Sequence, residues 1–371
     1  MTPRVVHVVL SLEIGGLEVL VLHMARAAMM RGETASIVCL DRGGPLVERA
    51  RNEGIDVHVL ARKGSILDRD ALTELRSILI KGNANIVHTH NIEAMFYGGL
   101  ASRGLSGCKV VHTQHGIPVP FSLKNRIKSA FASRQVDRFV CVSRDVQTYL
   151  ERFQLFRGLP YQTIRNGIDT GVFRPDSVRR QKIRDTLNIA DSDIVLICVA
   201  RLSGVKNHRR LLSVFDQLDH HSTRYRLLLV GDGPLVDDIQ EAIDASYHGN
   251  LIRMLGERHD IDALLSASDV FVLTSDSEGI SVSVLEAMSS GLVPVVTRVG
   301  GNPEIVDDGQ NGYCIEPGRE DNFVQKIDGL GKDHELRKTL SRHARSMVMS
   351  HFSLDKMIDS YRKIYVELCD E

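Results

Sequence analysis

The sequence has no run of about 18 apolar residues, no C-x-x-C pair and almost no net charge. The first absence argues against a membrane-spanning helix. The second argues against zinc and redox motifs, and the apolar surroundings of Cys39, Cys141 and Cys198 indicate buried thiols in a reducing compartment. Lys and Arg number 46 against 47 Asp and Glu, which excludes a highly basic protein that binds nucleic acid. Met1–Leu10 lacks a long apolar region with a cleavage site, so we expect no secretory signal and a cytoplasmic location.

A chain of 371 residues is too long for one ordinary domain. Short apolar runs alternate with segments of helical periodicity in both halves, which predicts parallel α/β sheets covered on both faces. The expected strands of the first half are 5–10, 36–40, 57–60, 86–89, 109–113 and 138–142. Those of the second half are 194–200, 226–230, 251–253, 270–274 and 293–297, with helices at about 207–219, 233–245, 259–266, 281–290 and 319–330.

The polar stretch 170–177, which contains Pro175, separates the two halves. We expect an N-terminal Rossmann-like domain at 1–172 and a C-terminal one at 173–353, facing each other across a cleft. The amphipathic segment 354–371 predicts a terminal helix that packs back on the first domain. Ligands of such sheets bind beyond the carboxyl ends of the strands, so residues that follow strands are the candidates.

The segment 275–306 carries the strongest signal. Strand 270–274 leads into a loop with Glu278, and a helix is expected to begin near Ser281, where free backbone N–H groups suit a phosphate. Glu286 lies inside this helix among apolar residues, and a buried carboxylate needs a partner. A ribose diol could supply two hydroxyl donors. Alternatively, Glu286 pairs with a nearby Arg or Lys and Glu278 is a solvated loop acid; spacing alone does not decide between these interpretations.

Two cations follow the strand 194–200. Arg201 and Lys206 lie in a loop before a helix, where they suit the negative charge that develops on a diphosphate leaving group. The alternative is a solvated basic loop, and we expect Arg209 and Arg210 to be of that kind.

Two weaker signals follow strands of the first half. Gly15 and Gly16 open a helix and allow close approach of a ligand to the backbone. They do not form a G-x-G-x-x-G motif, which argues against a Rossmann oxidoreductase. A lone histidine is more often structural, but the position of His115 in a loop before Gly116 favours a functional role.

In this order, ARLSGVKN, VGDGP, LGERHD, SDSEG, LEAMSSG and VGGNPE resemble the C-terminal half of glycosyltransferase family 4. LEIGGLE, HTQHG, CVS and RNGID resemble its N-terminal half, and the run EGISVSVLEAM with GGNPEIV is most similar to bacterial members from exopolysaccharide clusters. The resemblance implies a GT-B fold and a retaining, metal-independent hexosyltransferase without a cofactor. The donor would be a UDP- or GDP-sugar, and the acceptor a carbohydrate or a lipid-linked glycan.

The resemblance also implies that the domain 1–172 binds the acceptor and that the domain 173–353 binds the donor. It further implies residue roles on the donor side. Arg201 and Lys206 would bind the pyrophosphate, Glu286 the ribose hydroxyls and Glu278 the donor sugar. The amides that would contact sugar and phosphate belong to Gly279, Ile280, Ser281 and Val282.

On the acceptor side, the resemblance places Gly15 and Gly16 near the acceptor, with Gly16 also against the donor phosphates, and His115 by the donor sugar. Domain closure about a hinge at 165–178 would exclude water. The acceptor would attack the front face of the donor, and a donor phosphate oxygen would take its proton.

A basic amphipathic segment, 121–138, follows His115. Lys124, Arg126 and Lys128 could rest on an anionic membrane at the inner face of the plasma membrane, or the segment is a core-packed helix with a solvated basic face. Three rival functions stay open: a GT-B nucleotide-sugar epimerase, a Rossmann oxidoreductase, and a non-catalytic protein that binds nucleotide sugars.

Overall fold

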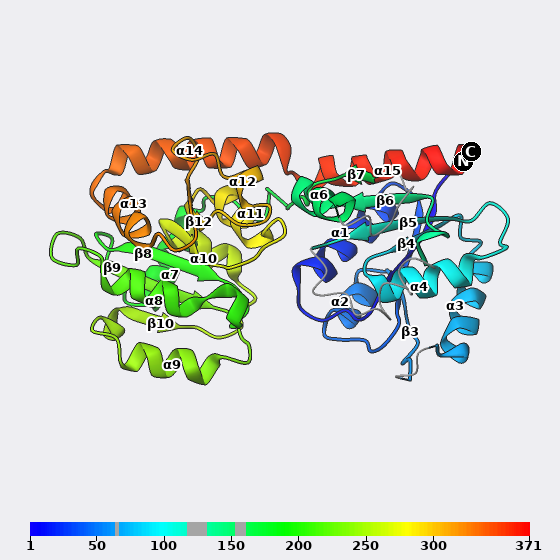
Figure 1. Cartoon of the computed structure of the whole chain (residues 1–371), viewed down its shortest axis with the longest axis horizontal. Coiled ribbons are helices and arrows are strands. Elements are labelled where there is room, and N and C mark those ends of the chain that lie inside the picture. Colours follow the sequence, from blue (N-terminus) through cyan, green and yellow to red (C-terminus); the bar gives the residue numbers. More distant parts are fainter. Residues whose placement is uncertain (64–66, 117–131, 153–160) are drawn as a thin grey trace. The chain divides into compact units, whose positions relative to one another are not determined.

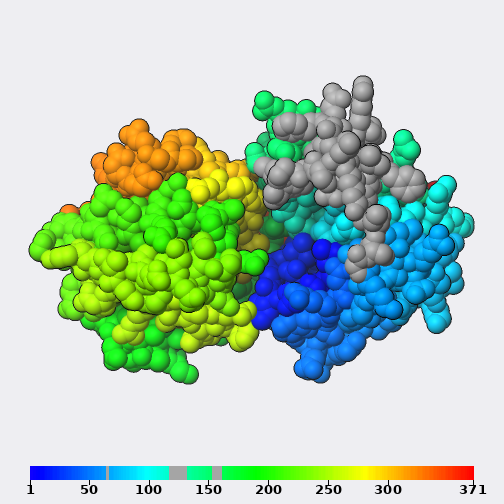
Figure 2. All heavy atoms as spheres, turned by 60° about the horizontal axis from the view of Figure 1, so that its bottom comes forward, coloured from blue at the N-terminus to red at the C-terminus, as the bar shows by residue number. Residues whose placement is uncertain are grey.

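The computed structural model describes residues 1–63, 67–116, 132–152 and 161–371. The remaining residues are drawn in grey (Figure 1) (Figure 2) and include the predicted membrane contacts Lys124, Arg126 and Lys128, which therefore lie outside the described part of the chain. The described residues form two compact units. Unit 1 comprises Met1–Arg165 and Lys356–Glu371, and unit 2 comprises Asn166–Asp355. Within the described ranges, no helix is long and apolar enough to cross a membrane.

Unit 1 contains a parallel seven-stranded sheet of order β3-β2-β1-β4-β5-β6-β7. Its strands are β1 (Arg4–Val9), β2 (Thr34–Cys39), β3 (Asp56–Val59), β4 (Ile86–Thr89), β5 (Lys109–Gln114), β6 (Arg138–Cys141) and β7 (Tyr161–Thr163). The central strands are buried along their length because helices cover both faces, as a parallel sheet requires. The predicted strands of the first half are confirmed, and β7 is an additional strand of only three residues.

Helices connect these strands in the manner of β-α-β units. They are α1 (Gly16–Met30), α2 (Leu46–Asn52), α3 (Arg69–Lys81), α4 (Ile92–Ser102) and α6 (Arg144–Arg152). Side-chain caps fix where two of them begin: Asp68 accepts hydrogen bonds from the backbone N–H groups of Asp70 and Ala71, and Asn91 accepts one from that of Ala94.

Unit 2 contains a parallel six-stranded sheet of order β10-β9-β8-β11-β12-β13. The strands are β8 (Ile194–Val199), β9 (Tyr225–Val230), β10 (Ile252–Met254), β11 (Val270–Leu273), β12 (Val293–Thr297) and β13 (Tyr313–Ile315). The helices are α7 (Ser177–Thr186), η1 (Gly204–Lys206), α8 (His208–Asp216), α9 (Val236–Asp244), η2 (Gly249–Leu251), α10 (Ile261–Ala267), α11 (Val282–Ser289), α12 (Asn302–Ile305), α13 (Glu320–Lys332) and α14 (His334–His351). The prediction of two parallel α/β sheets is therefore confirmed.

The strand β13 and the helices α7 and α14 are among the elements of unit 2 that were not predicted. The strand β13 has three residues, too few for periodicity to show. The helix α14 has 18 residues and carries many charges on its exposed side, while Leu340, Ala344 and Val348 at four-residue spacing bury its narrow apolar side.

The C-terminal helix α15 (Leu354–Asp370) runs alongside the sheet of unit 1 (red in Figure 1). Tyr361 and Tyr365 are both buried. The hydroxyl of Tyr361 lies 3.1 Å from Thr113 Oγ1 in β5, and that of Tyr365 lies 2.6 Å from His88 Nδ1 in β4. The last helix in the chain is thus part of the core of unit 1.

The chain passes between the units twice, near residue 165 and near residue 355. The two segments pair where they meet: the backbone N–H of Ile168 donates to Phe352 O at 2.9 Å, and that of Leu354 donates to Ile168 O at 2.8 Å. A side chain at Gly167 would overlap the backbone of Ser353. Glycine is therefore required for this close approach.

Candidate active site

The strand order of unit 2 reverses between β8 and β11, which makes their carboxyl ends the switch point of the sheet. Ligands of open α/β sheets bind at such points. The loop after β8 carries Arg201 and Lys206, and the loop after β11 carries Glu278. The sheet therefore brings together two loops that are about 70 residues apart in sequence.

Lys206 and Glu278 form an ion pair across these loops, with Nζ 2.6 Å from Oε1. The side chain of Glu278 is 7% exposed and that of Lys206 is 23% exposed. The interpretation of Glu278 as a solvated loop acid is therefore wrong. Arg201 is exposed, and its guanidinium has no ion-pair partner among the described residues.

Further bonds hold the two loops against each other. The backbone N–H of Asp276 donates to Val205 O at 2.8 Å, and Thr274 Oγ1 donates to Asn207 O at 2.9 Å. Arg210 pairs with Asp276 at 2.9 Å and with Glu320 at 3.0 Å. The expectation that Arg210 is a solvated cation is wrong, because its half-buried side chain binds three separate segments together. Arg209 is exposed as expected, although it pairs with Asp238.

Glycines of two further loops pack directly on this pair of loops. A side chain at Gly231 would overlap Ala200 O, and one at Gly300 would overlap Glu278 O. Both glycines have positive φ, 137° and 53° respectively, so any other residue would also be strained there. The motifs around residues 231 and 300 therefore support the loops that carry Arg201 and Glu278.

Glu286 lies one turn inside α11 and is partly buried. Desolvation raises the pKa of its carboxyl from 4.5 to about 8. Within the described part of the chain, no side chain or backbone N–H bonds to this carboxylate. The alternative in which Glu286 pairs with an Arg or Lys is thus not observed, and the carboxylate is left to accept hydroxyl donors from a ligand.

The helix α11 begins at Val282, with Ser281 as its N-cap in extended conformation. The Ser281 hydroxyl makes no capping bond and instead lies 3.2 Å from Ser283 Oγ. The first-turn N–H groups of a helix have no intrahelical partner and favour an anion. The four predicted donor-binding positions 279–282 form the approach to this helix end.

In unit 1 the strand order reverses between β1 and β4. Gly15 is the N-cap of α1 after β1, and Gly16 is the first residue of that helix. A side chain at Gly15 would meet only the carboxylate end of Glu18, a flexible group that can move aside.

His115 follows β5, the neighbour of β4 in the sheet. Burial lowers the pKa of its imidazole to about 3, so the ring is neutral at physiological pH. Its Nε2 lies 3.1 Å from Nδ1 of His90, which follows β4. The predicted acceptor-side residues Gly15, Gly16 and His115 therefore lie in unit 1, whereas the predicted donor-side cations and carboxylates lie in unit 2.

Sequence reasoning missed four other histidines of unit 1. His7, His88, His90 and His112 are all buried, at exposures of 0–1%. A signal was present in the motif VHTH at 87–90, because two histidines at i and i+2 in an apolar strand place imidazoles on one buried face.

Both halves of the chain match known families. Residues 14–172 match the model described as Glycosyltransferase Family 4, and residues 179–347 match the model described as Glycosyl transferases group 1. The chain belongs to glycosyltransferase family 4. The predicted family, the GT-B fold and the retaining glycosyltransferase activity are thereby confirmed.

Two curated relatives illustrate the similarity. The chain is 27% identical over 346 residues to the Escherichia coli UDP-Gal:alpha-D-GlcNAc-diphosphoundecaprenol alpha-1,3-galactosyltransferase, covering 90% of this chain and 89% of that enzyme. It is 28% identical over 305 residues to the N-acetyl-alpha-D-glucosaminyl L-malate synthase of Bacillus anthracis, covering 80% and 78%.

The fold is shared with solved structures. Anabaena HepE in complex with UDP superposes with a TM-score of 0.87 at 21% identity, covering 98% of this chain and all of that one. The complex of HepE with UDP-glucose superposes with a TM-score of 0.86 at 22% identity, covering 98% and 99%. Both superpositions extend over both units of this family 4 enzyme.

Proposed function

We propose that this glycosyltransferase moves a sugar, with retention, from a UDP- or GDP-sugar to a glycan or lipid-linked acceptor in the synthesis of bacterial exopolysaccharide, lipopolysaccharide or glycolipid. The named substrates of the Escherichia coli relative, a UDP-sugar and a diphosphoundecaprenol-linked sugar, support both halves of this proposal. The UDP and UDP-glucose complexes of HepE favour UDP over GDP as the nucleotide.

The observation that carries the proposal is the arrangement at the switch point of unit 2. Two cationic residues, Arg201 and Lys206, follow β8, and the start of α11 follows the neighbouring strand β11. Glu286 offers a carboxylate without a bonding partner in the described ranges. A nucleoside diphosphate presents the two complementary groups, an anionic diphosphate and a ribose diol.

Each donor-side residue then has a distinct task. Arg201 and Lys206 neutralise the diphosphate as the glycosidic bond to it breaks, which stabilises the charge of the transition state. The amides at 279–282 bind the sugar and the phosphate, and Glu286 accepts hydrogen bonds from the ribose hydroxyls. Glu278, held by Lys206, is positioned to contact the donor sugar.

On the acceptor side, α1 starts at Gly15 and Gly16, which have no side chains. The acceptor and the donor phosphates can therefore lie close to the backbone there. His115 presents a neutral imidazole to the donor sugar. The acceptor hydroxyl attacks the face from which the diphosphate departs, and a phosphate oxygen of the leaving group takes the proton. We further propose that the basic residues Lys124, Arg126 and Lys128 contact an anionic membrane.

The first experiment identifies the donor. Thermal-shift measurements with UDP, GDP, ADP and their sugars should show a rise in melting temperature with UDP that grows with ligand excess. Product analysis with an acceptor glycan then separates transfer from epimerisation, since an epimerase releases sugar without an acceptor. No shift with any nucleotide would contradict the proposal.

The second experiment tests the cations. Arg201→Ala and Lys206→Ala should each lower kcat by about 10²–10³-fold, as the loss of a charge-stabilising group does elsewhere. Arg209→Ala is the matched control, because that exposed arginine lies in α8, just after the loop of Arg201 and Lys206, and pairs with Asp238 of α9. Near-normal transfer by both variants would overturn their assignment.

For the membrane contact, vesicles with and without anionic lipid provide the test. Charge reversal of Lys124, Arg126 and Lys128 should abolish salt-sensitive binding to anionic vesicles. Binding that is unchanged by the reversal would refute the contact without affecting the assignment of the donor site.

A further inference from the structure

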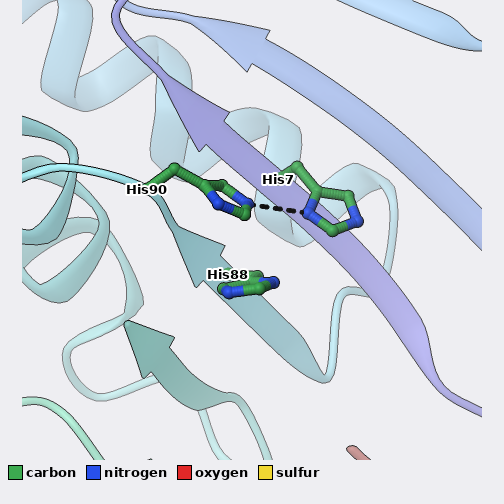
Figure 3. A group of neighbouring side chains, drawn as sticks. All are labelled: His7, His88 and His90. Carbon is green, nitrogen blue, oxygen red and sulfur yellow. Dashed lines mark hydrogen bonds between the residues drawn. The ribbon is translucent and has the colours of Figure 1, made fainter. Parts of the chain in front are cut away.

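Three imidazoles form a hydrogen-bonded row that ends at His115. His7 Nδ1 lies 3.1 Å from His90 Nε2, and His90 Nδ1 lies 3.1 Å from His115 Nε2. Figure 3 shows the first of these bonds, with the ring of His88 beside the pair. The row begins inside β1, crosses the segment after β4 and ends after β5.

The register of the sheet explains why the row forms. His7 in β1 is paired directly with His88 in β4, so their side chains lie on the same face. His90 is two residues further along and continues on that face past the end of the strand. His115 follows the next strand in the sheet, which brings its ring within reach of His90.

The rings of the row are neutral. Burial lowers the pKa of His7 and of His115 to about 3 and holds that of His90 well below 6.5. A neutral imidazole carries one N–H, and each of the two bonds needs one donor and one acceptor. Only two arrangements satisfy both bonds: the proton is on Nδ1 in all three rings, or on Nε2 in all three.

His115 Nδ1, the ring nitrogen outside the row, has a different role in each arrangement. It is an N–H donor in the first and a bare acceptor in the second. No residue in the described ranges forms a hydrogen bond with it. The hydrogen-bonding character that His115 presents to a ligand is therefore tied to the proton position on His7, two rings away.

A second set of bonds fixes His88, whose ring packs against the row. The ring of His88 lies 4.1 Å from that of His90, between centroids. Its two nitrogens are held by Tyr365 OH at 2.6 Å and by Thr113 Oγ1 at 2.7 Å. His88, which packs against His90, is thus fixed by Thr113 of β5 and Tyr365 of α15.

A metal ion bound by His7, His88 and His90 is the main alternative, because their nearest nitrogens lie within 4.8 Å of one another. However, both nitrogens of His88, both of His90 and Nδ1 of His7 already form hydrogen bonds. A metal would need unshared lone pairs on all three rings. It would therefore break bonds on His88 and His90, and the geometry favours the proton row.

We propose that His7 and His90 are positioning residues that set the tautomer of His115, so that the row couples the hydrogen bond made by His115 Nδ1 to the proton position on His7. The consequence for transfer rests on the proposed role of His115 at the donor sugar. The coupling itself does not, because it follows from the three rings alone.

Tautomers can be measured directly on the full chain labelled with ¹⁵N-histidine. Long-range ¹H–¹⁵N spectra distinguish the protonated from the bare ring nitrogen in each histidine. We expect His7, His90 and His115 to share one tautomer in the free enzyme. A spectrum in which His90 and His115 carry opposite tautomers would overturn the proposal.

Substitutions at His7 then test the coupling at a distance. His7→Asn places an amide at the position of Nδ1 and should preserve a single tautomer of His115, whereas His7→Leu should give a mixture of both. His58→Leu, a change in the same unit outside the row, is the control and should leave the His115 signals unchanged. Identical His115 signals in wild type and His7→Leu would refute the coupling.

Substitutions at His90 give a second measurement if His7→Leu fails to fold. His90→Asn keeps a polar group near Nδ1 and the bond to His115, while His90→Gln keeps one near Nε2 and the bond to His7. Each variant interrupts the row between His7 and His115, so the single His115 tautomer should be lost in both. A single His115 tautomer in either variant would contradict the row.

Kinetics and metal analysis complete the test. His7→Leu should lower kcat by about 10–100-fold, the effect of removing the partner that orients a functional imidazole at metal sites, with the Kd for UDP unchanged. If the wild type transfers no sugar, the proposed function fails while the spectra still decide the row. One zinc per chain that survives dialysis against EDTA would overturn the row in favour of a metal site.

Discussion

Replacement of Glu286 by glutamine should stabilise unit 2 relative to the wild type, by an amount that increases as the pH rises. The carboxyl of Glu286 has a pKa of about 8 in the folded chain because its surroundings are poorly solvated, against 4.5 when it is unperturbed. Between these values the unfolded chain ionises this group and the folded chain does not. Unfolding therefore releases a proton, and the free energy of unfolding falls as the pH rises from 4.5 toward 8.

The size of this effect follows from the pKa difference. Each pH unit in that window lowers the free energy of unfolding by up to about 1.4 kcal/mol, so a rise of about 1.5 pH units lowers it by up to about 2 kcal/mol. Glu286 is partly exposed, and solvent screens part of the penalty. We expect Glu286→Gln to gain about 1 kcal/mol relative to the wild type between about pH 6 and about pH 7.5.

Urea unfolding followed by circular dichroism measures this difference, with hydrogen exchange of β11 reporting on unit 2. Comparing the two proteins at each pH cancels the titration of every other group. Glu257→Gln, which removes an exposed carboxylate from the same unit, is the matched control. A difference between Glu286→Gln and wild type that is constant with pH would refute the account of a desolvated, unpartnered carboxyl.

Three further predictions concern the same unit. Ribose hydroxyls favour the ionised form of the Glu286 carboxyl, so binding of UDP near neutral pH should release a proton in the wild type but not in Glu286→Gln. Calorimetry in buffers of different ionisation enthalpy would detect this proton. Equal proton release by the two proteins would contradict the ribose role. Gly300→Ala should weaken UDP binding at least about tenfold in calorimetry, because its methyl group displaces Glu278 O; unchanged affinity would be inconsistent with this packing. Arg184 is fully buried, with its guanidinium 2.7 Å from the Asp269 carboxylate. Arg184→Met should lower the free energy of unfolding of unit 2, measured in urea, by about 3–5 kcal/mol, and by more than Arg180→Gln does. A smaller loss would mean that the Asp269 carboxylate is satisfied without Arg184.

Much of the fold could be predicted from local pattern. Strands such as β1 and β11 are buried on both faces, so their continuous apolar runs distinguish them from the amphipathic helices between them. The elements that escaped prediction include β7, β13, α7 and α14. The two strands are too short for periodicity, α7 buries only Arg184, and α14 has a narrow apolar side among many charges.

Part of the candidate site was also accessible to sequence reasoning. Residues that follow strands in an α/β chain lie at the carboxyl edge of a sheet, so Arg201, Lys206 and Glu278 could be selected by position alone. The side chains with which these residues pair could not be predicted in this way. Arg210 was expected to be solvated, yet it binds Asp276 and Glu320, because strand order brings loops together that are distant in sequence.

The sequence by itself therefore determined which segments become strands and helices, and which loops carry polar groups, because these properties depend on neighbours in the chain. Only the tertiary structure decided which polar groups meet. The pair Lys206–Glu278 and the row from His7 to His115 each depend on strand order and register, which are set by the packing of the whole sheet. The protonation of Glu286 was likewise decided by burial, a property that its place in the helix could suggest but that the surrounding unit establishes.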